Sequence, residues 1–95
     1  MSESPETRLK RLKLRSIRRG IREMDLLLAA FAADHLARLS PAELDAYEAL
    51  LDENDHDLLA WVTGSAETPA EHARMISKIS ADARASAHPE RFERF

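Results

Sequence analysis

The residue types of this chain favour helices so strongly that a sheet could hardly be built from them. Only five of the 95 residues are valine or isoleucine, whereas alanine, leucine, arginine and glutamate dominate. Valine and isoleucine are enriched in strands, and the four dominant types are good helix formers. A chain of this length also has room for only one small domain. We therefore predict a single all-α domain over residues 1–95, with an ordered core at about residues 6–84.

Start and stop signals divide the chain into five helices. Ser4 and Ser40 each stand directly before a proline, the arrangement of an N-cap followed by a proline in the first helical turn. Ser40 and Thr68 are each followed three residues later by glutamate, which predicts a capping box at both places. Gly20 and Gly64 are natural helix ends. The first two predicted helices cover residues 5–19 and 21–38. The third begins at residue 41, the short fourth runs from about 55 to 63, and the fifth begins at 69. We expect these helices to form a compact bundle, with a flexible N-terminus at 1–4 and a flexible tail at about 86–95.

Charge is segregated along the sequence. Residues 8–22 carry eight cations and no acid, whereas residues 34–71 carry ten acids and one base. Eight cations within fifteen residues repel one another unless negative charge lies close to them. We therefore expect either a partner surface or pairing of the basic segment with the acidic one, rather than two solvated faces.

The sequence lacks the residue patterns that enzymes and metal sites require. Cysteine is absent, only two glycines occur, and no two of the four histidines have the His-x-x-x-His spacing. The acids around Asp55 lack the architecture of a calcium loop, and Trp61 has the spacing of a core residue. We predict no catalytic activity, no metal and no tightly bound cofactor. The eight-residue apolar run at 26–33 is too short to span a membrane, so we expect no membrane partner. We also expect a cytoplasmic protein that is monomeric when free.

The turn after the first predicted helix has the most suggestive chemistry. Gly20 allows another surface to approach the backbone, because it has no side chain in the way. Arg19 and Glu23 flank it with a forked donor and a carboxylate. We expect both side chains to be presented outward at an exposed corner.

Two motifs resemble a known family. Residues 19–23 read Arg-Gly-Ile-Arg-Glu and match the Arg-Gly-x-x-Glu signature of the small flavinylation assembly factors of succinate dehydrogenase, the SdhE type, also called succinate dehydrogenase assembly factor 2. Residues 55–61 read Asp-His-Asp-Leu-Leu-Ala-Trp and resemble the family's Asp-Pro-Asp-Leu-x-x-Trp element, with His56 in place of proline. The resemblance covers about residues 8–80.

The resemblance implies an assembly chaperone and not an enzyme. Members of this family bind the flavoprotein subunit of succinate dehydrogenase and promote covalent attachment of FAD, so the FAD belongs to the client; the resemblance leaves fumarate reductase open as a second client. The partner-binding residues that it implies are Arg19, Gly20 and Glu23, with Arg18, Arg22, Asp25 and Asp57 as weaker candidates.

The basic run at residues 8–22 supports one alternative, a small nucleic-acid-binding or regulatory helical module. The acidic total charge and the absence of aromatic residues among the cations argue against it. We therefore expect no nucleic-acid partner.

Overall fold

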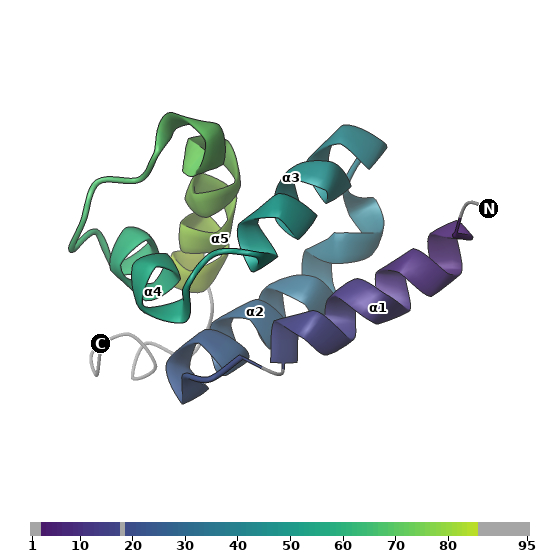
Figure 1. The fold of residues 1–95 in the computed structure, drawn as a ribbon, viewed down its shortest axis with the longest axis horizontal. Helices are drawn as coiled ribbons and strands as arrows, with labels where there is room; N and C mark the ends of the chain where they lie inside the picture. Colours follow the sequence, from purple (N-terminus) through teal and green to yellow (C-terminus); the bar gives the residue numbers. More distant parts are fainter. Residues whose placement is uncertain (1–2, 18, 86–95) are drawn as a thin grey trace.

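The computed structural model describes residues 3–17 and 19–85, and this part of the chain forms five α-helices and no strand (Figure 1). In chain order the helices are α1 (Pro5–Ile17), α2 (Arg22–His35), α3 (Pro41–Leu51), α4 (Asp55–Thr63) and α5 (Ala73–Ala85). Two short 3-10 helices are also present: η1 (Leu36–Arg38) directly follows α2, and η2 (Ala70–His72) directly precedes α5. The predicted all-α class and the number of helices are confirmed. The predicted tail at 86–95 lies outside the described residues, as do residues 1, 2 and 18, and the limits of the ordered domain stay a prediction.

Several predicted caps are present. The Ser4 hydroxyl accepts a hydrogen bond from the Thr7 amide at 3.1 Å, at the start of α1. At the start of α3, the Ser40 hydroxyl accepts from the Glu43 amide at 3.1 Å while the Glu43 carboxylate accepts from the Ser40 amide at 2.9 Å. This reciprocal pair is the predicted capping box. Gly64, with φ of 81°, ends α4 in the left-handed region that favours glycine.

The second predicted capping box is wrong. A capping box needs its hydroxyl at the N-cap and its glutamate at the third helical position. Here the N-cap position of η2 is Pro69, no side chain caps it, and Glu71 is the second residue of the 3-10 helix. Thr68 is therefore one residue too early to cap the segment. The end of the second predicted helix also differs, because residues 36–38 form η1 and α2 ends at His35.

The core lies where α1 and α2, which run in opposite directions, meet the other three helices (Figure 1). Tyr47 of α3 is fully buried at its centre, with its ring 5.7 Å from that of Phe31 and its hydroxyl 2.6 Å from the Ser16 hydroxyl. Burial raises the pKa of Tyr47 to about 12, so the phenol stays neutral at pH 7. Trp61 is only partly buried and packs against the edge of this core, stacked on the buried ring of His72.

The segregated charges pair with each other across α1 and α3. Arg8 contacts both Asp45, at 2.7 Å, and Glu48, at 3.1 Å. One and two turns further on, Arg11 reaches Glu48 at 2.8 Å and Arg15 reaches Asp52 at 2.7 Å. Residue numbers rise together along both helices, so α1 and α3 run parallel. The basic segment was expected either to form a partner surface or to pair with the acidic segment, and this pairing within the chain is confirmed. The pairs also place the end of α1 close to the end of α3, and therefore close to the start of α4.

No helix within residues 3–17 and 19–85 is both long and apolar enough to cross a bilayer.

Candidate functional site

The predicted site residues lie at the corner where α1 ends, the chain turns and α2 begins. Gly20 and Arg22 are exposed there, while Glu23 and Asp25, in the first turn of α2, are partly buried. Arg18 lies outside the described residues. Asp57 is exposed in the first turn of α4.

The Arg19 side chain points into the protein, and the expectation that it is presented outward is wrong. Only 10% of the side chain is exposed. Its Nε donates to Asp55 Oδ1 at 2.5 Å, its Nη2 donates to the Glu53 carbonyl at 2.6 Å, and its Nη1 donates to the Leu51 carbonyl. The guanidinium therefore joins the corner to the end of α3, the following loop and the start of α4. Three protein acceptors in a sheltered place leave this side chain fixed in orientation.

Gly20 lies at a close approach within this corner. Its amide donates to Asp55 Oδ2 at 2.7 Å, and a Cβ atom at this position would lie 3.3 Å from the same oxygen. Its φ lies outside the left-handed region, so its backbone conformation alone does not require glycine. The surface that approaches Gly20 is therefore, in the free chain, the carboxylate of Asp55.

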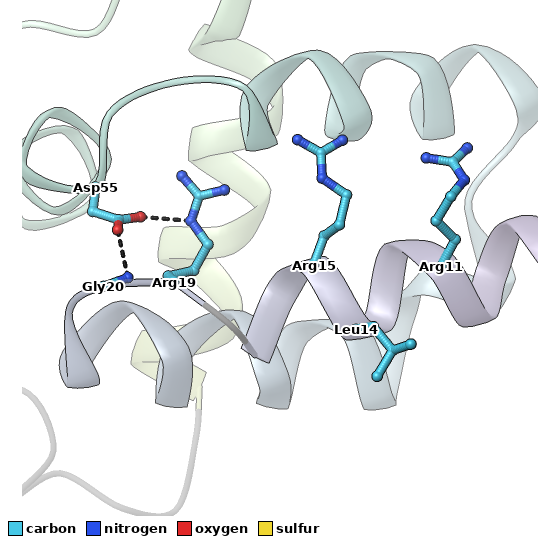
Figure 2. Close-up of a pocket in the computed structure, with 6 residues that line it drawn as sticks. All are labelled: Arg11, Leu14, Arg15, Arg19, Gly20 and Asp55. Carbon is cyan, nitrogen blue, oxygen red and sulfur yellow. Dashed lines mark hydrogen bonds and ion pairs between the residues drawn. The ribbon is translucent and has the colours of Figure 1, made fainter.

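Asp55 connects the motif at residues 19–23 to the element at residues 55–61 through hydrogen bonds. Its two carboxylate oxygens accept from Arg19 and Gly20 respectively (Figure 2). Burial opposes ionisation of this carboxyl group, but the hydrogen bonds from the Gly20 amide and the Arg19 guanidinium outweigh it, so the pKa of Asp55 lies below its ordinary value. The carboxylate is thus charged at neutral pH and is wholly engaged within the protein.

Asp25 also acts inside the corner. Its carboxylate accepts from the Arg19 amide at 2.8 Å, which ties the turn to the first turn of α2. By contrast, the side chains of Arg22, Glu23 and Asp57 form no hydrogen bond or ion pair with another described residue. The structure thus separates the candidates into residues that hold the corner together and residues whose polar groups remain available.

Asp55 was not predicted as a site residue, although the sequence contains a signal for it. The acids at 45, 48, 52 and 55 repeat the spacing of the arginines at 8, 11, 15 and 19 to within one residue, and the pairs Arg8–Asp45, Arg15–Asp52 and Arg19–Asp55 are 36 or 37 residues apart. Helix periodicity on both segments therefore pointed to a continuous row of pairs that ends at this corner. No such signal marked His72 of η2, which is buried. Its Nε2 lies 2.8 Å from the carboxylate of Glu53, in the loop between α3 and α4.

A groove of about 530 Å³ runs from the corner along α1 (Figure 2). Six residues line it: Arg11, Leu14, Arg15, Arg19, Gly20 and Asp55. Figure 2 shows Arg11 and Arg15 pointing toward α3 and Arg19 toward the loop that precedes Asp55, with Leu14 turned to the other side of this row. The groove therefore has one cationic edge and one apolar edge.

Among the residues that the structure describes, no cluster of three histidine, aspartate or glutamate side chains could hold a metal ion. The corner contains fixed hydrogen-bond donors and acceptors, and such an arrangement is suited to docking another surface.

A family model described as the flavinator of succinate dehydrogenase, Sdh5, matches residues 10–83. A Candida glabrata protein named succinate dehydrogenase assembly factor 2, mitochondrial, is 47% identical to the chain over 68 residues, which cover 72% of this chain and 44% of that protein. Proteins of the same name from Meyerozyma guilliermondii and Schizosaccharomyces pombe are 51% identical over 61 residues (64% of this chain, 45% of that protein) and 45% identical over 67 residues (70% and 48%). The chain spans somewhat less than half the length of these relatives.

The expectation of a cytoplasmic location is contradicted by these comparisons. The relatives are named as mitochondrial proteins, and the names point to the mitochondrion instead. Composition and the lengths of apolar runs distinguish aqueous from membrane surroundings, but they do not distinguish one aqueous compartment from another.

Proposed function

The chain belongs to the Sdh5 family of succinate dehydrogenase flavinators, and from this premise we propose that it is an assembly factor that binds the flavoprotein subunit of succinate dehydrogenase and promotes covalent attachment of FAD to that subunit. The observation that carries the proposal is the match of the family model over residues 10–83, which include the whole corner and Asp55. The chain acts as a binding protein, monomeric when free. It holds no cofactor tightly, and the FAD and the groups that react with it belong to the client.

Binding alone can promote such a reaction. A factor that binds the flavin-loaded, reactive geometry of its client more tightly than other geometries raises the population of that geometry. A tenfold preference corresponds to about 1.4 kcal/mol. The factor needs a rigid surface for this, because a surface that must be ordered on binding loses part of its affinity to that ordering.

The corner has the construction that this role requires. Arg19, Asp25 and Asp55 fix the backbone around Gly20 through hydrogen bonds of 2.5–2.8 Å. The exposed Gly20 then offers the client a flat approach, and the polar groups of Arg22, Glu23 and Asp57 are available for contacts with it. In this assignment Arg19 and Asp25 position the docking surface, and Glu23 contacts the client.

A nucleic-acid module is not favoured. Arg8, Arg11, Arg15 and Arg19 all form ion pairs with acids of the same chain, so four of the eight cations at residues 8–22 are neutralised internally. Fewer of these charges are then left to release counterions from a phosphate backbone.

A reconstitution experiment tests the proposal. The purified flavoprotein subunit, lacking covalent flavin, is incubated with FAD with and without the chain, and covalent flavin is read as fluorescence that survives a denaturing gel. We expect the chain to raise the yield of covalent flavin at a fixed time. Glu23→Gln should reduce this effect, while the matched control Glu67→Gln, an exposed glutamate outside the corner, should not. Equal yields with and without the chain would refute the proposed function.

A further inference from the structure

Large exposed apolar side chains are rare on this protein, and two of them lie together on α1. Leu14 and Ile17 are 50% and 47% exposed, and only Leu26 of α2, at 43%, is comparable among the described residues. Leu14 and Ile17 are three residues apart, so they lie on the same face of the helix, one turn from each other. The remaining leucines of α1, Leu9 and Leu12, pack against the core. The outer apolar pair thus contributes little to folding, and adjacent exposed apolar groups of this kind are typical of contact surfaces.

Arg15 is the groove arginine with donors to spare among the described residues. Arg11 donates through all three of its nitrogens, to Glu3 and Glu48, and Arg19 uses all three of its own. Arg15 donates only through Nη2, to an Asp52 side chain that is itself 72% exposed. Its Nε and Nη1 are therefore available as donors; they lie on different edges of the guanidinium, so a second carboxylate accepts from one of them at a time.

The lining of the groove carries positive side chains in a chain whose formal net charge is −3, and each of them also pairs with an acid of this chain. It includes three arginines and one acid, and both carboxylate oxygens of that acid, Asp55, already accept from Arg19 and Gly20. An incoming anion therefore meets no free negative charge within the lining. The volume of about 530 Å³ is in the range that accommodates a few side chains of a ligand.

We propose that this groove receives a segment of the client flavoprotein in which an acidic side chain stands beside an apolar one. The carboxylate accepts from a free donor nitrogen of Arg15, and the apolar side chain packs on Leu14, with Ile17 extending the contact by one turn. The inference rests on the proposed function and adds a second contact region to the corner, with which the groove is continuous because Gly20 lines both. The carboxylate complements the charge of Arg15, whose own acid partner, Asp52, is largely exposed, and the apolar contact excludes water from the ion pair.

Binding measurements with matched variants test this inference. The affinity of the full chain for the purified flavoprotein subunit is measured by isothermal titration calorimetry for Leu14→Ser and Arg15→Gln. The controls are Leu26→Ser and Arg74→Gln, which replace an equally exposed leucine on α2 and an exposed arginine on α5, both outside the groove lining. We expect each groove variant to weaken binding at least tenfold and each control to stay within twofold of the unchanged chain. Circular dichroism should show the same helicity for all four, because none of the replaced side chains belongs to the buried core.

Salt adds an independent readout. The affinity of the unchanged chain should fall as ionic strength rises, and the fall should be shallower for Arg15→Gln, because one charge pair is missing.

Three results would overturn the inference. In the first, the groove variants bind like the controls while the chain still promotes flavinylation, so the proposed function stands without the groove. In the second, Leu26→Ser weakens binding as much as Leu14→Ser. In the third, the free chain forms a concentration-dependent dimer that Leu14→Ser abolishes, which would make a second copy the occupant. Absence of both binding and flavinylation by the unchanged chain would instead refute the proposed function itself.

Discussion

Replacing Asp55 with alanine removes the acceptor that joins the two motifs. The substitution deletes the partner of Arg19 Nε and of the Gly20 amide in one step. The Arg19 guanidinium keeps its two carbonyl acceptors, but it loses its counter-charge in a place where water has little access. The exposed Gly20 amide can turn to solvent at little cost. The expected loss of stability therefore comes mainly from a sheltered cation without an anion beside it.

The magnitude follows from how far the pair is buried. Breaking a fully buried ion pair costs about 3–5 kcal/mol, and an exposed pair contributes about 0–1 kcal/mol. The Arg19 and Asp55 side chains are 10% and 19% exposed, which places the pair nearer the buried limit. The two retained carbonyl contacts soften the loss. We expect Asp55→Ala to lower the free energy of unfolding by about 2–3 kcal/mol, because charge-assisted hydrogen bonds contribute about 1.5–3 kcal/mol each and are not additive here.

Urea unfolding followed by circular dichroism measures this loss. For a chain of this size a change of 2–3 kcal/mol lowers the urea midpoint by about 1–3 M. Asp57→Ala is the matched control, because Asp57 shares the first turn of α4 and its helix-dipole interaction, worth about 0.3–1 kcal/mol, but is exposed and does not contact Arg19. Asp52→Ala removes the exposed pair with Arg15 and should change stability by less than 1 kcal/mol. If Asp55→Ala costs no more than Asp57→Ala, the central role given to the Arg19–Asp55 pair is wrong.

Three further changes should have measurable effects. Acid should destabilise the protein, because hydrogen bonds from Arg11 and Arg8 lower the pKa of Glu48 and the pKa of Asp55 is lowered too. As the pH falls, these carboxylates therefore take up protons in the unfolded state before they do so in the folded state. The urea midpoint should fall as the pH drops from about 5 to 3. Gly20→Ala should lower the free energy of unfolding by up to about 1 kcal/mol in urea titrations, because the new Cβ crowds Asp55 Oδ2 and this outweighs the ~0.4–1 kcal/mol gained from a stiffer unfolded chain. Trp61→Ala should cost about 2–3 kcal/mol by the same measurement, less than the ~3–5 kcal/mol of a fully buried aromatic residue, because the indole is only partly buried.

The candidate site was located from the sequence, but the directions of its side chains were not. The motif at residues 19–23 correctly predicted a corner with an exposed glycine, and the element at 55–61 lies beside it. Arg19 was expected to face outward, because it flanks Gly20 together with Glu23 at a corner that another surface could approach. Its anion comes from a residue 36 positions later, and only the packing of α1 beside α3 brings that residue to it.

The sequence by itself determined the helical class, the number of helices and the first residues of α1, α3 and α4. These properties depend on residue propensity, on capping within four residues and on short motifs, all of which are local. Tertiary structure decided which charges neutralise each other, which arginine keeps free donors and how closely the Asp55 carboxylate approaches Gly20. Those properties depend on contacts between residues about 36 positions apart, whose distance is set by how whole helices pack.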